Sequence, residues 1–327
     1  MDLRESIFWM NGRLATNCVE ISEDPNSLDK DGFWVVVKDF EGKFLSARFE
    51  NVVDAELPKV DWQKLTGSWL SSQSKEIYQK NVEQIKSLIS DGVVYQVNLC
   101  RVLSTECDQS LQGLAAELLE KNPAPFASYL KLPGLEIASA SPELFLKRNG
   151  DLLQCSPIKG TAKSADFGDK DKAENVMIVD LIRNDFGQIC ESGSIEVPRL
   201  LGIEEHPGLF HLVSDVIGKL KSGITWNSIL NSLTPAGSIS GAPKSSAIKT
   251  IAEIENSPRG PYCGVIGWSQ GDQALMSVGI RLFWSLQDGK INFGTGAGIT
   301  WSSDSKSEWD ETELKADRLI SIAGGVR

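Results

Sequence analysis

The chain has only two histidines among its 327 residues, and its six cysteines form no Cys-x-x-Cys pair. So few imidazole groups leave little material for a multi-histidine metal centre or for serine-protease-like chemistry. Without paired cysteines a structural zinc site is not supported, and we expect reduced, buried thiols. One of the two histidines, His206 in a Glu-Glu-His-Pro segment, is expected in a loop.

Positive charge is also scarce, because 33 lysines and arginines face 44 aspartates and glutamates, for a net charge of −11. This balance argues against non-specific nucleic-acid binding, which needs a basic surface. No apolar run approaches the roughly 18–20 residues that span a bilayer. Residues 1–5 are acidic and lack the apolar core of a secretory signal. We therefore predict a cytoplasmic protein, with neither nucleic acid nor membrane as a partner.

Hydrophobic periodicity predicts both helices and strands. Apolar residues approximate a helical stripe over 74–90, and from residue 93 apolar and polar residues alternate as in a strand. The pair Asp288-Gly289 is a strong hairpin signal. Long antiparallel runs with helices between them favour an α+β fold over a Rossmann fold. Further predicted elements are strands at 33–37, 44–49, 126–132 and 135–140, and helices at 110–121, 171–187 and 243–254.

The chain is long enough to bury a substantial core in one large domain or two ordinary ones. Residues 1–73 hold short β-like runs and no recognisable catalytic residue, and the polar stretch at 68–74 is typical of a linker. We therefore predict a shortened, β-rich N-terminal region at 1–73 and a catalytic domain at 74–327.

Lys159 stands in the segment Pro-Ile-Lys-Gly-Thr, a short apolar turn bounded by proline and glycine. A lysine that loses hydration beside apolar walls can have a pKa low enough to leave a neutral, nucleophilic amine. On the local sequence alone, the alternative is an exposed lysine in a β-turn, because most lysines are exposed.

Glu308, Glu311 and Lys315 lie on one face of a helix that advances 100° per residue. Two carboxylates three residues apart repel each other unless a cation or a lysine lies between them. One interpretation is an exposed helix with a weak Glu311–Lys315 ion pair. The other is a magnesium site, which Glu174 on a distant predicted helix favours. Three further acidic residues are expected to be solvated or capping rather than metal ligands: Asp171, Asp180 and Asp185.

Two segments rich in glycine or serine could bind an anion. Residues 294–298 read Gly-Thr-Gly-Ala-Gly and are expected as a loop after a strand, where backbone N–H groups can approach a ligand. Tight turns use the same residues, so a plain turn is the alternative. Residues 238–244 lead into a helix start, where hydroxyls and helix N–H groups favour an anion. The alternative there is simple capping by Ser240.

In their order along the chain, these motifs resemble the chorismate-utilising enzymes, the family of the large subunits of anthranilate synthase and aminodeoxychorismate synthase. The resemblance covers roughly residues 74–327. It implies two large antiparallel sheets packed face to face, with helices outside. The segments that carry it include Ser-Pro-Glu-Leu-Phe at 141–145, the Lys159 segment, Asp-Leu-Ile-Arg-Asn-Asp at 180–185, His-Leu-Val-Ser at 211–214, Gly-Ala-Pro-Lys at 241–244, Gly-Ile-Arg at 279–281, the glycines at 294–298 and the helix segment 308–316.

The resemblance also implies roles for individual residues. Lys159 would add covalently to ring carbon C2 of chorismate, while Glu143 protonates the departing 4-hydroxyl. A Mg²⁺ ion between Glu174 and Glu311, with Glu308 close by, would grip the ring carboxylate. The remaining substrate contacts would come from Thr161, His211, Ser240, Tyr262, Arg281, Gly296, Ala297, Gly298 and Lys315.

Two positions bear on the reaction. A lysine at position 159 is characteristic of the para-aminobenzoate branch of the family, whereas anthranilate-forming members usually carry alanine there. Gln96 stands where water-adding members place a catalytic lysine, so water addition is disfavoured. The resemblance therefore implies amination of chorismate to 4-amino-4-deoxychorismate, with ammonia delivered by a separate glutaminase subunit. The alternatives are an anthranilate-forming enzyme that also eliminates pyruvate, and a catalytically inactive chorismate-binding protein.

Overall fold

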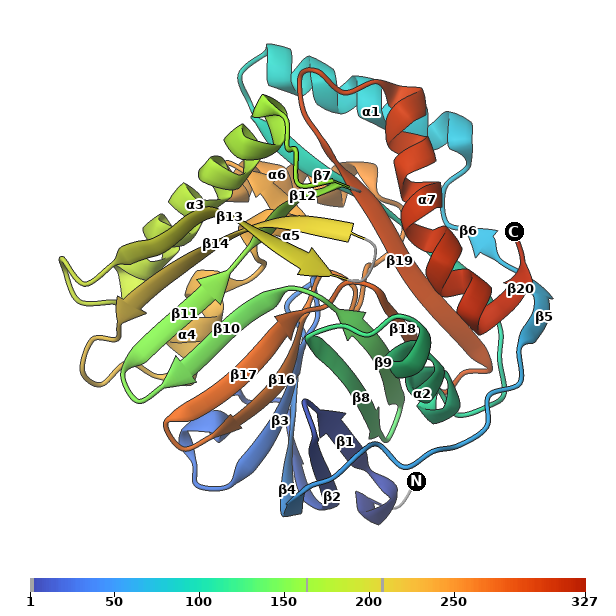
Figure 1. Ribbon diagram of the computed structural model, residues 1–327, viewed down its shortest axis with the longest axis vertical. Coiled ribbons are helices and arrows are strands. Elements are labelled where there is room, and N and C mark those ends of the chain that lie inside the picture. Colours follow the sequence, from blue (N-terminus) through green and yellow to red (C-terminus); the bar gives the residue numbers. More distant parts are fainter. Residues whose placement is uncertain (1–2, 163, 207–208) are drawn as a thin grey trace.

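The computed structural model describes residues 3–162, 164–206 and 209–327, and it has the expected α+β fold (Figure 1). Eighteen strands form one continuous antiparallel network, in which no gap separates two sheets. The two facing sheets that the resemblance implied are thus parts of a single sheet that curls on itself. Two more short strands, β5 (Leu65–Ser68) and β20 (Gly324–Val326), pair in parallel.

This sheet has two arms. In pairing order, the first arm consists of β7 (Gln96–Glu106), β19 (Lys290–Ile299), β18 (Leu282–Ser285), β9 (Leu135–Ser141) and β8 (Phe126–Leu132). The second arm consists of β16 (Val265–Gln270), β17 (Gln273–Val278), β10 (Leu144–Asn149), β11 (Leu152–Ser156), β14 (Leu209–Lys219) and β13 (Glu196–His206). Three short strands extend the individual arms. In the first arm, β6 (Leu70–Ser71) and β15 (Gly241–Ala242) pair with β7, and in the second arm β12 (Ile158–Ala162) pairs with β14.

The two arms are bridged by the strands that come first in the sequence. Their pairing order is β1 (Ile7–Met10), β2 (Arg13–Ser22), β4 (Phe44–Asp54) and β3 (Phe33–Lys38). At one end of this bridge β1 pairs with β8, and at the other β3 pairs with β16. The strand runs predicted at 33–37 and 44–49 are confirmed. Strands on both sides of residue 73 thus belong to the same sheet, and the boundary drawn there remains a prediction from the sequence.

The helices pack outside the sheet, as Figure 1 shows. Ser74 caps the first of them by accepting a hydrogen bond from the Ile77 backbone N–H at 3.3 Å, and the four predicted helices are confirmed to within a few residues. The short helices α4 and α5 were not predicted. The helices are α1 (Lys75–Ser90), α2 (Gln112–Lys121), α3 (Asp169–Ile189), α4 (Trp226–Leu233), α5 (Gly237–Ser240), α6 (Lys244–Ile254) and α7 (Ser305–Ala323), with two short 3₁₀ turns at Leu3–Glu5 and Pro25–Asp29.

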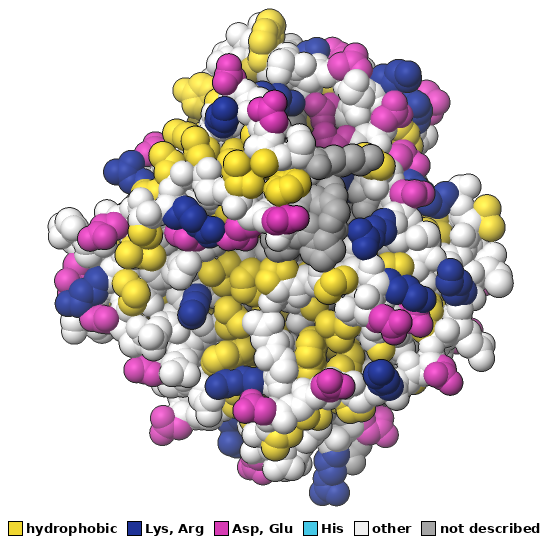
Figure 2. Space-filling view, viewed as in Figure 1, with side chains coloured by type: hydrophobic (Ala, Val, Ile, Leu, Met, Phe, Trp, Pro, Cys, Tyr) yellow, Lys and Arg dark blue, Asp and Glu magenta, His cyan; other side chains and the backbone are white. Residues whose placement is uncertain are grey.

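The core consists of apolar side chains between the sheet and the helices, and Trp34 and Trp226 are each about 1% exposed. All six cysteines are buried and free, as the sequence predicted. In the part of the chain that the structure describes, no helix is long and apolar enough to cross a membrane. Hydrophobic side chains gather in the hollow of the curled sheet (Figure 2), which has a volume of about 610 Å³ and is lined in part by Phe126 and Trp268.

Candidate active site

The predicted catalytic lysine lies where strands of the two arms come together. Lys159 is on β12, which pairs with β14 of the second arm, and Gly298 is on β19 of the first arm. A Cβ atom on Gly298 would lie 2.5 Å from Nε2 of Gln96 and 3.8 Å from Nζ of Lys159. Any side chain at position 298 would therefore displace the Gln96 amide. The glycine lets two functional groups from β7 and β12 approach each other.

The amine of Lys159 has no close partner. Among the described residues, no side chain or backbone atom forms a hydrogen bond or ion pair with it, and the side chain is partly buried. Burial lowers its pKa, and the negative charges of Glu174 and Glu143 only partly oppose this effect. A lysine in this environment is more readily deprotonated than an exposed one, as the nucleophilic interpretation requires.

Glu143 follows β9 and precedes β10, and it is only 4% exposed. Burial raises the pKa of its carboxyl to about 7, although Ser238, Lys159 and Arg281 all favour the charged form. At neutral pH a sizeable fraction of this carboxyl is protonated. A buried acid with a pKa near the working pH is suited to donate a proton to a leaving group.

The three predicted metal ligands come from two helices. On α3, Glu174 accepts a hydrogen bond from Nε2 of Gln96 at 3.3 Å and lies 3.9 Å from Nζ of Lys170. On α7, burial raises the pKa of Glu308, which the charge of Glu311 raises further. In the described parts of the chain, no three His, Cys, Asp or Glu side chains are close enough together to hold a metal ion. The carboxylates therefore do not form a closed three-ligand site.

Glu311 forms an ion pair with Lys315, as the interpretation of this segment as an exposed helix predicted. Nζ of Lys315 lies 2.6 Å from its carboxylate, and the same ammonium donates to the backbone oxygen of Gly296 at 3.1 Å. Burial alone would raise the pKa of Glu311, but Lys315, Lys170 and Lys159 lower it below its usual value. Both side chains of the ion pair are about half exposed, so their carboxylate and ammonium remain accessible to a ligand.

Arg281 provides a second unpaired cation. Its backbone has a left-handed φ of 52°, its side chain is partly buried, and burial lowers its pKa. No carboxylate among the described residues lies within ion-pair distance, although the charge of Glu143 acts on it. A guanidinium within electrostatic range of Glu143 but without a carboxylate partner at ion-pair distance is suited to bind an anionic ligand.

The glycine-rich segment differs from its prediction. Gly294, Gly296 and Gly298 do not form a loop after a strand; they lie inside β19 and pair with β7. The physical reason is space, because a Cβ atom would lie 2.0 Å from the Tyr262 ring at position 294 and 2.6 Å from Sγ of Cys100 at position 296.

The other predicted contacts are placed as follows. His211 is buried on β14, and Ala297 is buried on β19. The hydroxyl of Ser240 donates to the backbone oxygen of Ala236 at 2.8 Å, so its proton is already used. The side chain of Thr161 lies outside the described residues, and so does that of His206, whose backbone ends β13 rather than lying in a loop.

Two acidic residues on α3 differ in environment. Asp180 is exposed and pairs with Arg183, as expected. Asp185, by contrast, is buried, with its carboxylate 2.6 Å from Nζ of Lys244, so the expectation of a solvated or capping residue is wrong. The Lys170–Glu174 pair was not predicted, but its i, i+4 spacing on one helix is a signal that could have revealed it.

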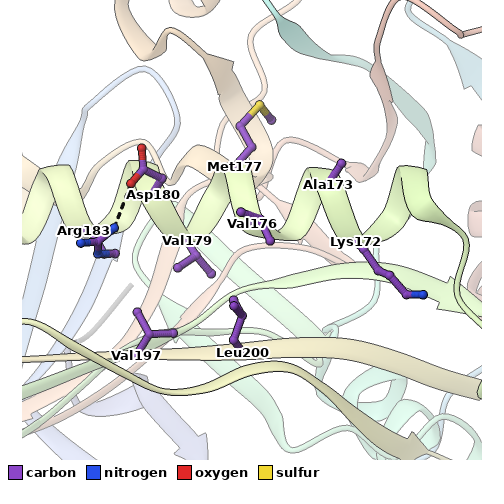
Figure 3. Close-up of a pocket in the computed structure, with 9 residues that line it drawn as sticks. All are labelled: Lys172, Ala173, Val176, Met177, Val179, Asp180, Arg183, Val197 and Leu200. Atoms are coloured by element: carbon purple, nitrogen blue, oxygen red, sulfur yellow. Dashed lines mark hydrogen bonds and ion pairs between the residues drawn. The ribbon is translucent and has the colours of Figure 1, made fainter.

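Another groove, on the side of α3 that faces β13, contains none of the predicted site residues. It has a volume of about 640 Å³ and lies between α3 and β13 (Figure 3). Val176, Val179, Val197 and Leu200 project into it, and its charged groups are at the edges. Its described lining residues include no buried acid and no desolvated lysine, so we place the candidate active site at Lys159 and Glu143.

The fold and the site together define an enzyme with a buried acid beside a desolvated lysine. Residues 37–321 match the family model described as chorismate binding enzyme, and the chain belongs to this family. The matched residues begin within the bridging strands. As a member of the family, the chain is a chorismate-utilising enzyme.

Relatives with different names are similarly close. The chain is 34% identical over 309 residues to anthranilate synthase component 1 of Archaeoglobus fulgidus, covering 90% of this chain and 74% of that protein. It is 33% identical over 311 residues to aminodeoxychorismate synthase component 1 of Escherichia coli, covering 88% of this chain and 68% of that protein.

Solved structures share the fold. A putative 2,3-dihydroxybenzoate-specific isochorismate synthase from Bacillus anthracis has a TM-score of 0.81 at 21% identity, covering 98% of this chain and 96% of that chain. Anthranilate synthase component I from Streptococcus pneumoniae has a TM-score of 0.81 at 23% identity, with 96% and 89% covered. At these identities the likeness concerns the fold alone.

Proposed function

We propose that this chain is the aminating component of an aminodeoxychorismate synthase. It would convert chorismate and ammonia to 4-amino-4-deoxychorismate, on the route to para-aminobenzoate and folate. The observation that carries the proposal is the pair formed by Lys159, whose amine has no hydrogen-bond or ion-pair partner among the described residues, and Glu143, whose pKa is raised to about 7. One group is suited to attack the ring and the other to protonate what leaves it.

The reaction divides into two substitutions. In the first, the neutral amine of Lys159 forms a bond to ring carbon C2, both double bonds of the ring diene shift by one position toward C4, and the 4-hydroxyl leaves as water with the proton of Glu143. In the second, ammonia forms a bond to C4, both double bonds shift back, and the bond between C2 and Lys159 breaks. The new C4 ammonium then releases a proton, and Glu143 takes one up to regain its starting state. The net change is chorismate plus ammonia to aminodeoxychorismate plus water.

Substrate recognition would use two cations of the site, Arg281 and Lys315. Chorismate carries two carboxylates, and Arg281 offers a fork of donors that can bind one of them bidentately. Lys315, anchored on the Gly296 backbone oxygen, would assist from α7. Tyr262, packed against Gly294, would form part of the wall at this side.

Magnesium fits the remaining carboxylates. Mg²⁺ prefers oxygen ligands and is usually held by one or two carboxylates together with oxygens of the substrate. Glu174 and Glu311 would hold the ion, with Glu308 nearby. The negative charge of Glu311 raises the pKa of Glu308, and a bound cation would relieve this repulsion between the two carboxylates. When bound, the ion would supply positive charge for the ring carboxylate. Lys170 and Lys315, which contact these carboxylates in the structure, would have to release them.

Ammonia rather than water is the proposed nucleophile, because of Gln96. This residue is 2% exposed, and its amide carbonyl oxygen has no hydrogen-bond partner among the described residues. An amide cannot deprotonate water as a neutral lysine can, but its oxygen can accept a hydrogen bond from ammonia. The names of the relatives as component 1 support a further proposal, that a separate glutaminase subunit generates the ammonia.

Anthranilate formation is the second candidate, because a similar relative is named anthranilate synthase component 1. Lys159 argues against it. The deciding experiment incubates the purified chain with chorismate and Mg²⁺, with either ammonium or glutamine, and identifies products by mass spectrometry. We expect aminodeoxychorismate with ammonium and almost none with glutamine. Anthranilate as the main product would contradict the assigned reaction, and efficient use of glutamine would show that no partner is needed.

A further inference from the structure

A small cavity adjoins Glu143. Its volume is about 20 Å³, and its wall is mostly apolar, with contributions from Phe145, Leu233 and other side chains. Three lining residues can hydrogen-bond: Glu143, Ser238 and Asp185. A buried water molecule needs at least about 10–15 Å³ and two to four polar partners. The cavity therefore has the size and the partners for one water molecule.

Asp185 lines this cavity, and its partner Lys244 is partly exposed. One of its carboxylate oxygens, Oδ2, accepts a hydrogen bond from Nζ of Lys244 at 2.6 Å. The other, Oδ1, accepts none from the residues that the structure describes. Lys244 also donates to the backbone oxygen of Ser232 at 3.3 Å, and its side chain is 19% exposed. The buried carboxylate thus has one free oxygen and one partner that reaches the surface.

The charges of Asp185 and Glu143 both act on the thiol of Cys155. Cys155 also lines the cavity, and its pKa is raised by burial first and then by the charge of Asp185, with a smaller effect from Glu143. Both carboxyl groups therefore lie within electrostatic range of one buried side chain. The charged groups that face Glu143 are Lys159 and Arg281, and the one that faces Asp185 is Lys244.

We propose that a water molecule in this cavity connects Glu143 to Asp185, and that Asp185 and Lys244 form a path by which Glu143 exchanges its proton with solvent. In this path Asp185 first takes a proton from solvent beside Lys244, the water molecule takes that proton from Asp185, and the water gives a proton to the Glu143 carboxylate. Asp185 is then a positioning and proton-relay residue, separate from the groups that touch the substrate. The need for such a path rests on the proposed function, because bound substrate would cover the opposite side of Glu143.

The first test does not depend on any activity. A high-resolution crystal structure of the ligand-free protein should show a water molecule within hydrogen-bond distance of both Glu143 and Asp185. Infrared titration of the Glu143 carboxyl, assigned with Glu143→Gln, should give a changed midpoint in Asp185→Asn and the wild-type midpoint in Asp180→Asn, the exposed control on the same helix. A dry cavity, or a midpoint that Asp185→Asn leaves unchanged, would overturn the proposal even if the chain proves to be an aminating enzyme.

The second test uses the reaction. Asp185→Asn should lower kcat about tenfold, leave KM for chorismate unchanged, and recover when a small acid such as formate is added, because formate can replace the relay. Asp180→Asn should behave as wild type. If Asp185→Asn fails to fold, Ser238→Ala removes another partner of the water and should give the same rescuable loss. A folded variant whose activity is lost but not rescued would show a purely structural role and contradict the relay.

Discussion

The side-chain amide of Gln96 donates a hydrogen bond to the carboxylate of Glu174 at 3.3 Å, while its carbonyl oxygen is buried with no partner among the described residues. The bond to Glu174 fixes which end of the amide faces which neighbour. An unsatisfied buried acceptor costs free energy unless a ligand satisfies it. Beside Lys159, a small hydrogen-bond donor such as ammonia would do so.

Gln96→Ala should therefore weaken the use of ammonia more than the binding of chorismate. Removing one hydrogen bond of about 1 kcal/mol corresponds to a rise of about fivefold in KM for ammonia. Steady-state kinetics with ammonium as the varied substrate measures this, and Asn98→Ala on the same strand is the matched control. An equal rise in KM for ammonia and for chorismate would show that Gln96 has a structural role and does not bind ammonia specifically.

Lys159→Ala should abolish the covalent adduct with the ring and reduce amination by about a thousandfold or more, because the nucleophile is gone. Mass spectrometry of the denatured protein after incubation with chorismate detects the adduct. Lys172→Ala, an exposed lysine on α3, should retain both adduct and activity. Wild-type rates in the Lys159 variant would exclude the covalent route.

The raised pKa of Glu143 predicts an acid requirement in the reaction. Because the pKa is about 7, amination should fall as the pH rises above 7, by about tenfold per unit once deprotonation is complete. Glu143→Gln should remove this limb together with most of the activity. A pH profile of kcat/KM checks the midpoint, and an unchanged high-pH limb in the glutamine variant would assign it to another group.

The same group makes a prediction about folding. Its pKa is raised in the folded protein above the ordinary value of 4.5, so its contribution to stability is fully present below about pH 4.5 and is lost as the pH rises through about 7. Relative to the wild type, Glu143→Gln should therefore become more stable as the pH increases over this window. Chemical denaturation at pH 5 and pH 8 measures the difference, and a wild-type–variant gap that is independent of pH would contradict it.

Two glycine substitutions should act in opposite directions. Gly298→Ala places a Cβ atom 2.5 Å from the Gln96 amide, so it should cost about 1–3 kcal/mol of stability and most of the activity. Gly187→Ala on α3 meets nothing within 4 Å and should stabilise the protein by about 0.5–1 kcal/mol. Thermal unfolding and activity assays compare them. Full activity in Gly298→Ala would show that Gln96 is free to move.

Activity should require Mg²⁺ and disappear in excess chelator. Glu174→Gln and Glu311→Gln each remove a negative charge from the proposed site, so the Mg²⁺ concentration for half-maximal activity should rise about tenfold. Asp180→Asn, which changes the same charge outside the site, should leave this concentration unchanged. Undiminished activity in the presence of chelator would contradict a role for the metal.

Local signals in the sequence were enough to predict several elements and to single out the candidate catalytic pair. The cap at Ser74 and the helical stripe after it involve neighbours a few residues apart, so the first helix could be predicted well. Lys159 and Glu143 were found because each lies in a distinctive short segment. The acidity of Glu143 could not be predicted, because it depends on burial by elements far apart in the sequence.

Long-range contacts explain what was missed. Glycine normally indicates a turn, but at 294–298 it makes room for the Tyr262 ring, Cys100 and Gln96, which come from other elements. Asp185 looked like a surface residue because Lys244, its partner, lies 59 residues away. The curling of the sheet was equally invisible, since pairing of β1 with β8 and β3 with β16 leaves no local pattern.

The strands β1 to β4, which bridge the two arms of the sheet, limit how far the chain can be truncated from its N-terminus. If the strands β1 to β4 were deleted, β16 would lose a neighbour along its full length and β8 would lose one over residues 128–131. Both would become open strand edges, with unpaired N–H and C=O groups that invite pairing with other molecules. The catalytic groups of the two arms would also lose the covalent and hydrogen-bonded span that sets their separation. Trimming the chain to the motif-bearing region would then yield aggregation rather than a minimal enzyme.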